Sequence, residues 1–220
     1  MITPRLESII NLITTDTIAD IGTDHAYIPI RLAQDGKIKK AIACDKNKGP
    51  LEIAAQNIEH YQLSDIIETR LGDGLNPLRV NEVSDIVIAG MGGKLICNIL
   101  SENIHVARAS TLILQPMNAQ YELRKFLYEN GFTIKKEDLS CEGFKVYNVM
   151  IVESGEDNSK YDELDFHIPP QLSEHKLFSM LKEKKKREFT KILNGQKSSA
   201  RDFSAENEYY SKLLLKLDNL

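Results

Sequence analysis

Three absences narrow the classes of protein that this 220-residue chain can belong to. No run of about 18 apolar residues is present, so a membrane-spanning helix is not expected. The N-terminal residues MITPRLESII lack the basic start and small-residue cleavage site of a signal peptide, which predicts a cytoplasmic protein. The cysteines Cys44, Cys97 and Cys141 are far apart and suggest neither a disulfide framework nor a CxxC metal pattern, so buried reduced thiols are expected.

What is present is an apolar-rich chain with an uneven charge distribution. Apolar residues make up 42% of the sequence, enough for one packed α/β domain with an appendage. Residues 171–220 carry 11 Lys and Arg against 7 Asp and Glu, a net charge of +4, whereas residues 1–170 carry 17 against 25, a net charge of −8. A basic segment can bind a polyanion, although a lysine run is more commonly a solvated helix face.

Strand-like and helix-like segments alternate over the first 155 residues. Strands are expected at 17–22, 40–45, 66–73, 85–91 and 111–116, and helices at 28–34, 50–61, 93–102 and 119–130. Two further β-rich runs, 132–143 and 145–154, are expected to pair antiparallel. The pattern predicts an α/β fold with a doubly wound parallel sheet. The closing β-hairpin resembles class I methyltransferases more than dinucleotide dehydrogenases, which more often continue β-α-β.

The C-terminal part reads as a separate helical unit. A polar stretch ends in Pro169-Pro170 and suggests a linker or edge segment. Helical spacing follows at 172–193 and 203–220, with the turn NGQKSS between them, which predicts a coiled-coil-like helical hairpin. Its expected apolar seam contains Phe203, Tyr210, Leu213, Leu214, Leu217 and Leu220. We therefore expect domains at 1–160 and 161–220.

Four consecutive strand ends are rich in glycine and aspartate. The residues are Asp20, Gly22, Thr23, Asp24 and His25 after the first strand, Asp45 after the second, Gly72, Asp73 and Gly74 after the third, and Ala89, Gly90, Met91, Gly92 and Gly93 after the fourth. Any one of these groups is ordinary turn chemistry. Turns at the other edge lack this concentration, and open α/β sheets bind ligands at the carboxyl ends of their strands. We therefore expect a ligand site there.

The first of these turns favours a cofactor without phosphate. In a G-x-G-x-x-G turn the bare backbone holds a pyrophosphate, but here Asp24 and Tyr27 occupy the second and third glycine positions. An aspartate would repel the pyrophosphate of NAD or FAD. S-adenosylmethionine carries a cationic sulfonium and ammonium, which Asp20 and Asp24 could face. Asp45 would then accept hydrogen bonds from the ribose, and Asp73 from the adenine amine.

The quoted residues resemble one family across nearly the whole chain. The segments are DIGTDHAYIP from Asp20, DKNKGPL from Asp45, RLGDGL from Arg70, IAGMGG from Ile88 and LILQP from Leu112. They resemble the bacterial tRNA (adenine-22) N1-methyltransferases, the TrmK family. The resemblance implies a Rossmann-like class I methyltransferase domain with a C-terminal helical domain, S-adenosylmethionine as cofactor, no metal, and methylation of an adenine N1 in the D-arm of tRNA. Arg5 and Lys46 join the expected cofactor-binding residues.

The end of the fourth strand fits attack by a ring nitrogen. Amino-methylating enzymes of this fold commonly place Asn or Asp there, whereas Ala89-Gly90-Met91-Gly92 offers no side-chain base. Adenine N1 has a free lone pair when the base is unpaired, so catalysis would depend on positioning by backbone groups of Gly90 to Gly92. The flipped base would stack against Tyr27 and Met91. The alternatives are that Tyr27 packs on the sheet and Met91 fills the core.

Other candidate residues have open alternatives. His25 would contact the cofactor or substrate, or cap a helix, and Gln115 would read an adenine edge or support the strand end. His60, His105, His167 and His175 share no metal-like spacing. The expected tRNA contacts are Lys182, Lys184, Lys185, Lys186, Arg187, Lys191, Lys197 and Arg201, unless they form a solvated face or protein contact. The competing functions are methylation of a protein or small molecule, with the helices as a lid or dimer contact, and non-enzymatic binding of S-adenosylmethionine or a nucleotide.

Overall fold

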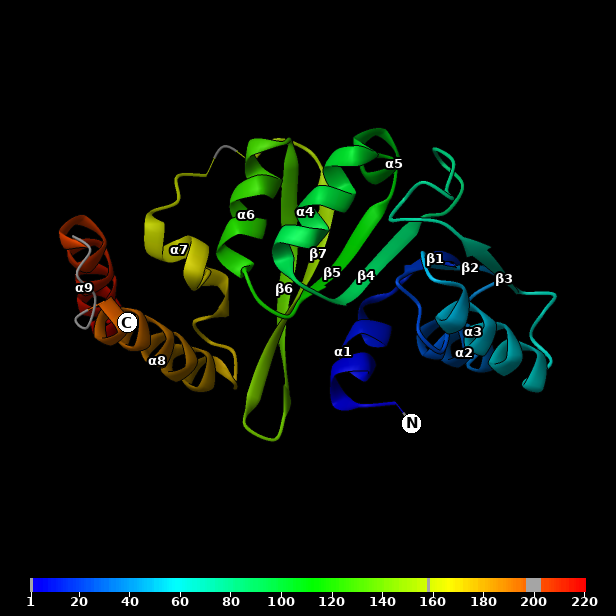
Figure 1. Cartoon of the computed structure of the whole chain (residues 1–220), viewed down its shortest axis with the longest axis horizontal. Helices are drawn as coiled ribbons and strands as arrows, with labels where there is room; N and C mark the ends of the chain where they lie inside the picture. Colours follow the sequence, from blue (N-terminus) through cyan, green and yellow to red (C-terminus); the bar gives the residue numbers. More distant parts are fainter. Residues whose placement is uncertain (1, 158, 197–202) are drawn as a thin grey trace. The chain divides into compact units, whose positions relative to one another are not determined.

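The computed structural model describes residues 2–157, 159–196 and 203–220 (Figure 1). They form two compact units, Met1–Asn158 and Ser159–Leu220. Two expected tRNA contacts, Lys197 and Arg201, lie outside the described residues. Within the described ranges, no helix is both long and apolar enough to cross a lipid bilayer.

A seven-stranded sheet forms the centre of the first unit. Its spatial order is β3-β2-β1-β4-β5-β7-β6. The first five strands along the chain are parallel, and β7 runs antiparallel to both β5 and β6. The bounds are β1 Thr17–Ile21, β2 Lys40–Asp45, β3 Ile67–Leu71, β4 Asp85–Met91, β5 Thr111–Pro116, β6 Phe132–Glu142 and β7 Lys145–Ser154. The predicted Rossmann-like sheet with a closing hairpin is confirmed.

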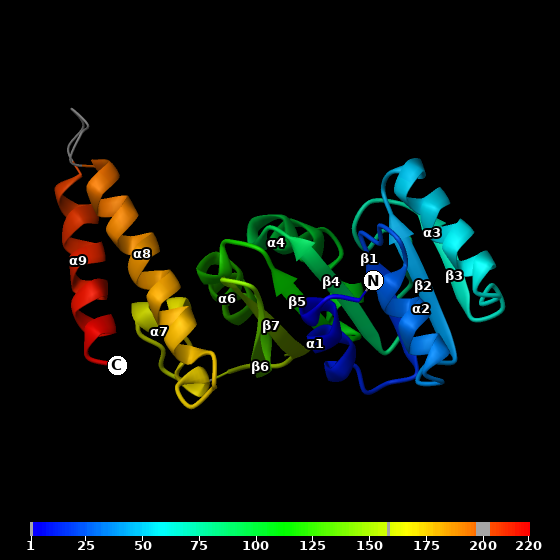
Figure 2. The same ribbon diagram turned by 90° about the horizontal axis from the view of Figure 1, so that it is seen from below.

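Helices cover both faces of this sheet (Figure 2). Consecutive strand residues point to opposite faces, so Ile18 packs with one helical layer and Ala19 with the other. Because both faces are covered, the central strands are apolar along their length. The first layer holds α1 Pro4–Leu12, α2 Tyr27–Gln34 and α3 Lys48–His60, and the second holds α4 Gly93–Glu102, α5 Ile104–Arg108 and α6 Gln120–Glu129.

Helix α1 has no counterpart in the sequence-based expectations. Its N-cap is Thr3, whose side-chain oxygen accepts a hydrogen bond from the Leu6 amide, and Pro4 occupies the first turn. Ile9 and Ile10 are buried against the sheet. The helix places Arg5 beside the ends of β4 and β5, where its side chain bonds to the end of β5.

The second unit contains the expected pair of helices, preceded by short elements. These are α7 Glu163–His167 and a 3-10 turn at Pro170–Leu172, followed by α8 Phe178–Gln196 and α9 Ser204–Asp218. Helix α8 thus begins six residues after the predicted position 172. Phe189 of α8 packs on Tyr210 of α9 with ring centroids 5.6 Å apart. Leu213 and Leu217 are buried in the seam, whereas Leu220 is exposed; a coiled-coil supertwist remains a prediction.

Candidate cofactor and substrate site

A cavity of about 80 Å³ opens at the carboxyl ends of β1 to β4. It brings together six of the expected cofactor-binding residues, although these come from segments up to 52 residues apart, from Gly22 to Gly74. Its lining consists of Ile21, Gly22, Asp45, Lys46, Asn47, Gly72, Asp73, Gly74, Met91, Leu95 and Ile99. The remaining expected cofactor-binding residues do not line this cavity; they are Arg5, Asp20, Thr23, Asp24, His25, Ala89 and Gly90.

Gly22 and Met91 determine how much room the cavity has. Gly22 has a φ of +74°, which favours glycine. A Cβ on Gly22 would lie 2.2 Å from Cε of Met91, so the methionine side chain lies directly over the β1 turn. The cavity is smaller than the roughly 300–1,000 Å³ typical of small-molecule pockets, and Met91 is a flexible side chain that narrows it.

A buried carboxyl group lies next to this turn. Asp20 is 7% exposed. Burial raises the pKa of Asp20 to about 6, and the Asp45 carboxylate adds to the shift, while the nearby Thr23 hydroxyl opposes it. The Thr23 Oγ1 atom is itself buried and has no well-formed hydrogen bond to any described residue. Neither side chain lines the cavity, but an ionised Asp20 carboxyl group beside it would favour a cationic ligand.

The acidic ends of β2 and β3 complete the lining. Asp45 Oδ1 accepts a hydrogen bond from the Asn47 amide at 2.7 Å, which fixes the carboxylate at the start of the β2–α3 connection. Gly72 and Gly74 flank Asp73, and a Cβ on Gly72 would lie 2.4 Å from Pro77. Lys46 is the cation of the lining. Carboxylates therefore outnumber cations, which suits a cationic nucleoside better than a pyrophosphate.

Gln115 connects the ends of β4 and β5 to α1. Its side chain is fully buried, and its Oε1 accepts hydrogen bonds from Nη1 of Arg5 at 2.7 Å and from the Gly90 amide at 3.1 Å. Gly90 has a φ of +78° and lies where the register between β4 and β5 shifts. The Arg5 guanidinium also lies over the ring of Tyr147, 5.9 Å from its centroid. Because its oxygen is already bonded, Gln115 supports the strand end.

Two of the backbone groups expected to hold the substrate are already bonded. The Gly90 amide donates to Gln115, and the Met91 carbonyl accepts from the Met117 amide at 2.8 Å. The Gly92 amide has no partner among the described residues. Asn118 lies close to it, with Oδ1 3.0 Å from where a Cβ on Gly92 would stand. Asn118 was not expected from the sequence; its position two residues after the end of β5 was the available signal.

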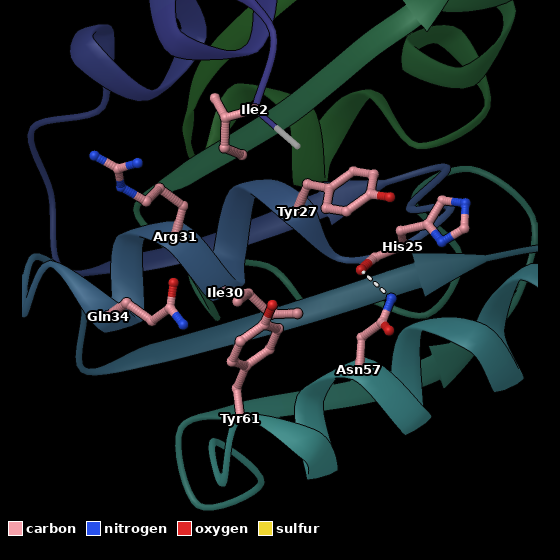
Figure 3. A pocket seen from close by; sticks show the side chains of 8 residues that line it. All are labelled: Ile2, His25, Tyr27, Ile30, Arg31, Gln34, Asn57 and Tyr61. Atoms are coloured by element: carbon pink, nitrogen blue, oxygen red, sulfur yellow. Dashed lines mark hydrogen bonds between the residues drawn. The ribbon is translucent and has the colours of Figure 1, made fainter.

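A second cavity, of about 390 Å³, is lined mainly by side chains of α2, together with Asn57 of α3 (Figure 3). His25 and Tyr27 line it, and their rings stack with centroids 4.9 Å apart. The His25 carbonyl accepts a hydrogen bond from Asn57 of α3, and the His25 ring lies 3.3 Å from the exposed Asp24 carboxylate. Tyr27 therefore lines a different cavity from Met91, although the two were expected to form one wall.

Helix α8 carries six of the eight expected tRNA contacts, in two different environments. Lys185 is 4% exposed and bonds Glu188, and Lys186 bonds Asp218 at 2.6 Å. Arg187 and Lys191 are exposed, and together with Lys182 they have no charged partner among the described residues. Arg187 and Lys191 line an open groove along α8. Of the expected tRNA contacts on α8, Lys182, Arg187 and Lys191 are therefore available to bind phosphate.

The cysteines and histidines give no metal centre within the described ranges. Cys44 is buried, and burial raises its pKa to about 12, so this thiol stays protonated. Cys97 and Cys141 are half-buried, which corrects the expectation that all three are buried.

The sheet order, the closing hairpin and the acidic strand ends define a Rossmann-like methyltransferase. A family model described as "Methyltransferase domain" matches residues 2–150. The tRNA (adenine(22)-N(1))-methyltransferase of Bacillus subtilis is 35% identical over 160 residues, which cover 72% of this chain and 67% of that protein. The chain belongs to the TrmK family of bacterial tRNA (adenine-22 N1) methyltransferases, so the predicted family is confirmed.

Solved structures agree over the full chain. Streptococcus pneumoniae Sp1610 in complex with S-adenosyl-L-methionine has a TM-score of 0.87 at 32% identity, covering 100% of this chain and 99% of that chain. M. capricolum TrmK in complex with S-adenosyl-homocysteine has a TM-score of 0.84 at 28% identity, covering 100% and 97%.

Proposed function

We propose that this protein transfers a methyl group from S-adenosylmethionine to N1 of adenine 22 in the D-arm of tRNA. Membership of the TrmK family supports the reaction and the cofactor. The observation that carries the chemistry is the end of β4, where Ala89-Gly90-Met91-Gly92 provides no acid or amide side chain. The unpaired N1 lone pair of adenine needs no general base. Because its substrate is tRNA, we place the enzyme in the cytoplasm.

The strand-end cavity is the proposed cofactor site. S-adenosylmethionine supplies an electrophilic methyl group on a cationic sulfonium. Asp45 is proposed to accept hydrogen bonds from the ribose hydroxyls, and Asp73 from the adenine amine of the cofactor. The buried Asp20 carboxyl group, next to the Thr23 hydroxyl, provides negative potential for a cation. Gly22 allows the cofactor to approach the β1 turn closely, and a change of the Met91 rotamer enlarges the cavity.

The target adenine is proposed to lie over the end of β4. Gln115 and Arg5 hold the Gly90 bulge, so their role is to position the backbone. The Gly92 amide and the Asn118 side-chain amide, neither of which has a hydrogen-bond partner among the described residues, are proposed to hydrogen-bond an adenine edge. Catalysis then consists of holding N1 in line with the methyl group. Tyr27 and His25 are proposed to contact RNA beside this position.

The second unit is proposed to bind the tRNA backbone. Lys182, Lys184, Arg187 and Lys191 of α8 remain in this proposal, together with Lys197 and Arg201. Lys185 and Lys186 are instead assigned a structural role, because they form ion pairs with Glu188 and Asp218, respectively. Such phosphate contacts supply affinity that falls with rising salt.

Incubation with methyl-labelled S-adenosylmethionine tests the reaction class. Unmodified tRNA, a protein extract and a small-molecule extract are offered in parallel. We expect label in tRNA alone. Label in protein or in small molecules would establish the competing enzyme class, and cofactor binding without any transfer would establish a sensor.

A further inference from the structure

The β6–β7 hairpin extends past the edge of the sheet that carries the proposed site (Figure 1). Strand β7 pairs with β5 through Leu112 opposite Val152 and Leu114 opposite Met150. In this register Pro116, the last residue of β5, is level with Asn148. The β6–β7 ladder continues to Glu142 opposite Lys145, three residues further. At about 3.4 Å per residue, the tip projects roughly 10 Å beyond the strand ends.

An aromatic side chain stands at this tip. Phe144 is 99% exposed and follows Gly143, whose φ of +57° forms the turn. An isolated exposed apolar residue needs no explanation by itself. Phe144, however, is more exposed than every other large hydrophobic residue described, and Met117 and Leu95 are further exposed apolar residues at the same edge. Lys145, directly after it, adds an exposed positive charge.

The hairpin is held in place on the catalytic side. Glu142 Oε1 accepts a hydrogen bond from the Arg5 amide at 3.2 Å, which ties the tip to the start of α1. Tyr147 of β7 lies under the Arg5 guanidinium, and Arg5 bonds Gln115 at the end of β5. The base of the tip is therefore anchored to the same residues that hold the Gly90 bulge.

We propose that Phe144 stacks on a nucleobase of the tRNA next to the target adenine. This inference rests on the proposed function. An adenine whose N1 is attacked must leave its stack and its pair, at a cost of a few kcal/mol. Exposed aromatic rings stack on unpaired RNA bases, and such a contact offsets the cost. Phe144 is thus a positioning residue, because its ring holds the base next to the target adenine while the strand ends of the sheet hold the reacting atoms.

The test compares steady-state methylation of unmodified tRNA by the wild-type enzyme, Phe144→Ala, Phe144→Leu and Phe144→Trp. Removal of one base-stacking contact weakens binding about 5- to 100-fold. We expect Phe144→Ala and Phe144→Leu to raise the KM for tRNA by a factor in that range and Phe144→Trp to restore it. The KM for S-adenosylmethionine should stay unchanged in all variants. Val80→Ala, at a half-exposed apolar residue in the connection that enters β4, is the matched control and should behave as wild type.

A second readout places the contact on the RNA. The tRNA carries 2-aminopurine at the nucleotide on either side of the target, and stacking on Phe144 should quench its fluorescence with wild type but not with Phe144→Ala. If the wild-type enzyme methylates tRNA and Phe144→Ala is indistinguishable from it in both readouts, the inference is overturned and the proposed function stays intact. Rescue by leucine would overturn it as well, because that result indicates an apolar contact without stacking. A wild-type enzyme that does not methylate tRNA would instead refute the proposed function.

Discussion

At the strand ends of the first unit, Gln115 and Asp20 are almost fully buried, whereas on α8 of the second unit Arg187 and Lys191 are exposed. The buried groups have defined partners or raised pKa values, so each has one working geometry. Arg187 and Lys191 have no charged partner among the residues that the structure describes, so they can adopt many rotamers. The strand-end edge should therefore be sensitive to single substitutions, whereas the basic helix α8 should act through its summed charge. The following substitutions test that contrast.

The largest expected effect is on stability and comes from Asp20. Its pKa is raised, so the folded state binds the proton more tightly than the unfolded chain does. The cost of ionising it is absent below about pH 3, grows as the pH rises through about 4 to 6, and is complete above about pH 7 at about 3 kcal/mol. Asp20→Asn should therefore raise the free energy of unfolding by about 3 kcal/mol more at pH 7.5 than at pH 3, as measured by urea denaturation without cofactor.

The control for that measurement is Asp16→Asn. Lys39 lowers the pKa of Asp16, so its ionised form is favoured and the pH dependence has the opposite sign. Equal effects of the two substitutions at both pH values would contradict the buried environment assigned to Asp20.

Next in size is the effect of Asp45→Ala on cofactor affinity. Loss of a charged hydrogen-bond acceptor costs about 1.5–3 kcal/mol, or roughly a 10- to 100-fold rise in the Kd of S-adenosylmethionine. Isothermal titration calorimetry measures it. Asp65→Ala, at an exposed carboxylate before β3, is the matched control. An unchanged Kd for Asp45→Ala would show that the ribose lies elsewhere.

Gln115→Leu should slow methyl transfer while sparing cofactor binding. It leaves the Gly90 amide and the Arg5 guanidinium without their shared acceptor, so the bulge at the end of β4 relaxes. We expect kcat to fall about 10-fold, equivalent to about 1.4 kcal/mol, with the Kd of S-adenosylmethionine little changed. Gln115→Glu keeps an acceptor for both donors and should retain more activity. Gln56→Leu, on the exposed face of α3, controls for the change of side chain. Full activity of Gln115→Leu would refute the positioning role of Gln115.

Arg187→Glu should give the smallest effect. One exposed charge contributes little by itself, so the KM for tRNA should rise about 3- to 10-fold and the KM for S-adenosylmethionine should not change. The salt dependence of tRNA binding should also become shallower. Lys212→Glu on α9 makes the same change in net charge at a lysine that pairs with Glu208. Identical effects of the two reversals would show that overall charge, and not the α8 surface, sets tRNA affinity.

The sequence predicted the sheet well because its signals are local. The apolar runs that became β1, β2, β4 and β5 lie within one or two residues of their expected bounds, and the closing hairpin was recognised from two adjacent β-rich runs. Helix α1 was missed although Thr3 and Pro4 form an N-terminal capping pattern. The start of α8 was placed early because helical spacing continues across the 3-10 turn at Pro170–Leu172.

The site was predictable only in part, because its contacts join distant segments. Aspartates and glycines at strand ends could be listed from the sequence, and the structure gathers Asp45, Asp73 and Gly22 around one cavity. No local pattern shows that Gln115 bonds both Arg5 and Gly90. Likewise, the division of Tyr27 and Met91 between two cavities depends on how α2 leaves β1, which spacing along the chain does not encode.

Mapping the methylated atom tests most directly whether this protein methylates N1 of adenine 22. Unmodified tRNA and a variant with guanine at position 22 are incubated with the enzyme and S-adenosylmethionine, then analysed by nucleoside mass spectrometry and by reverse transcription, which stops at N1-methyladenine. We expect one N1-methyladenine per molecule, at position 22, and none in the variant. Methylation of another nucleotide, of the exocyclic amine, or of both tRNAs alike would contradict it.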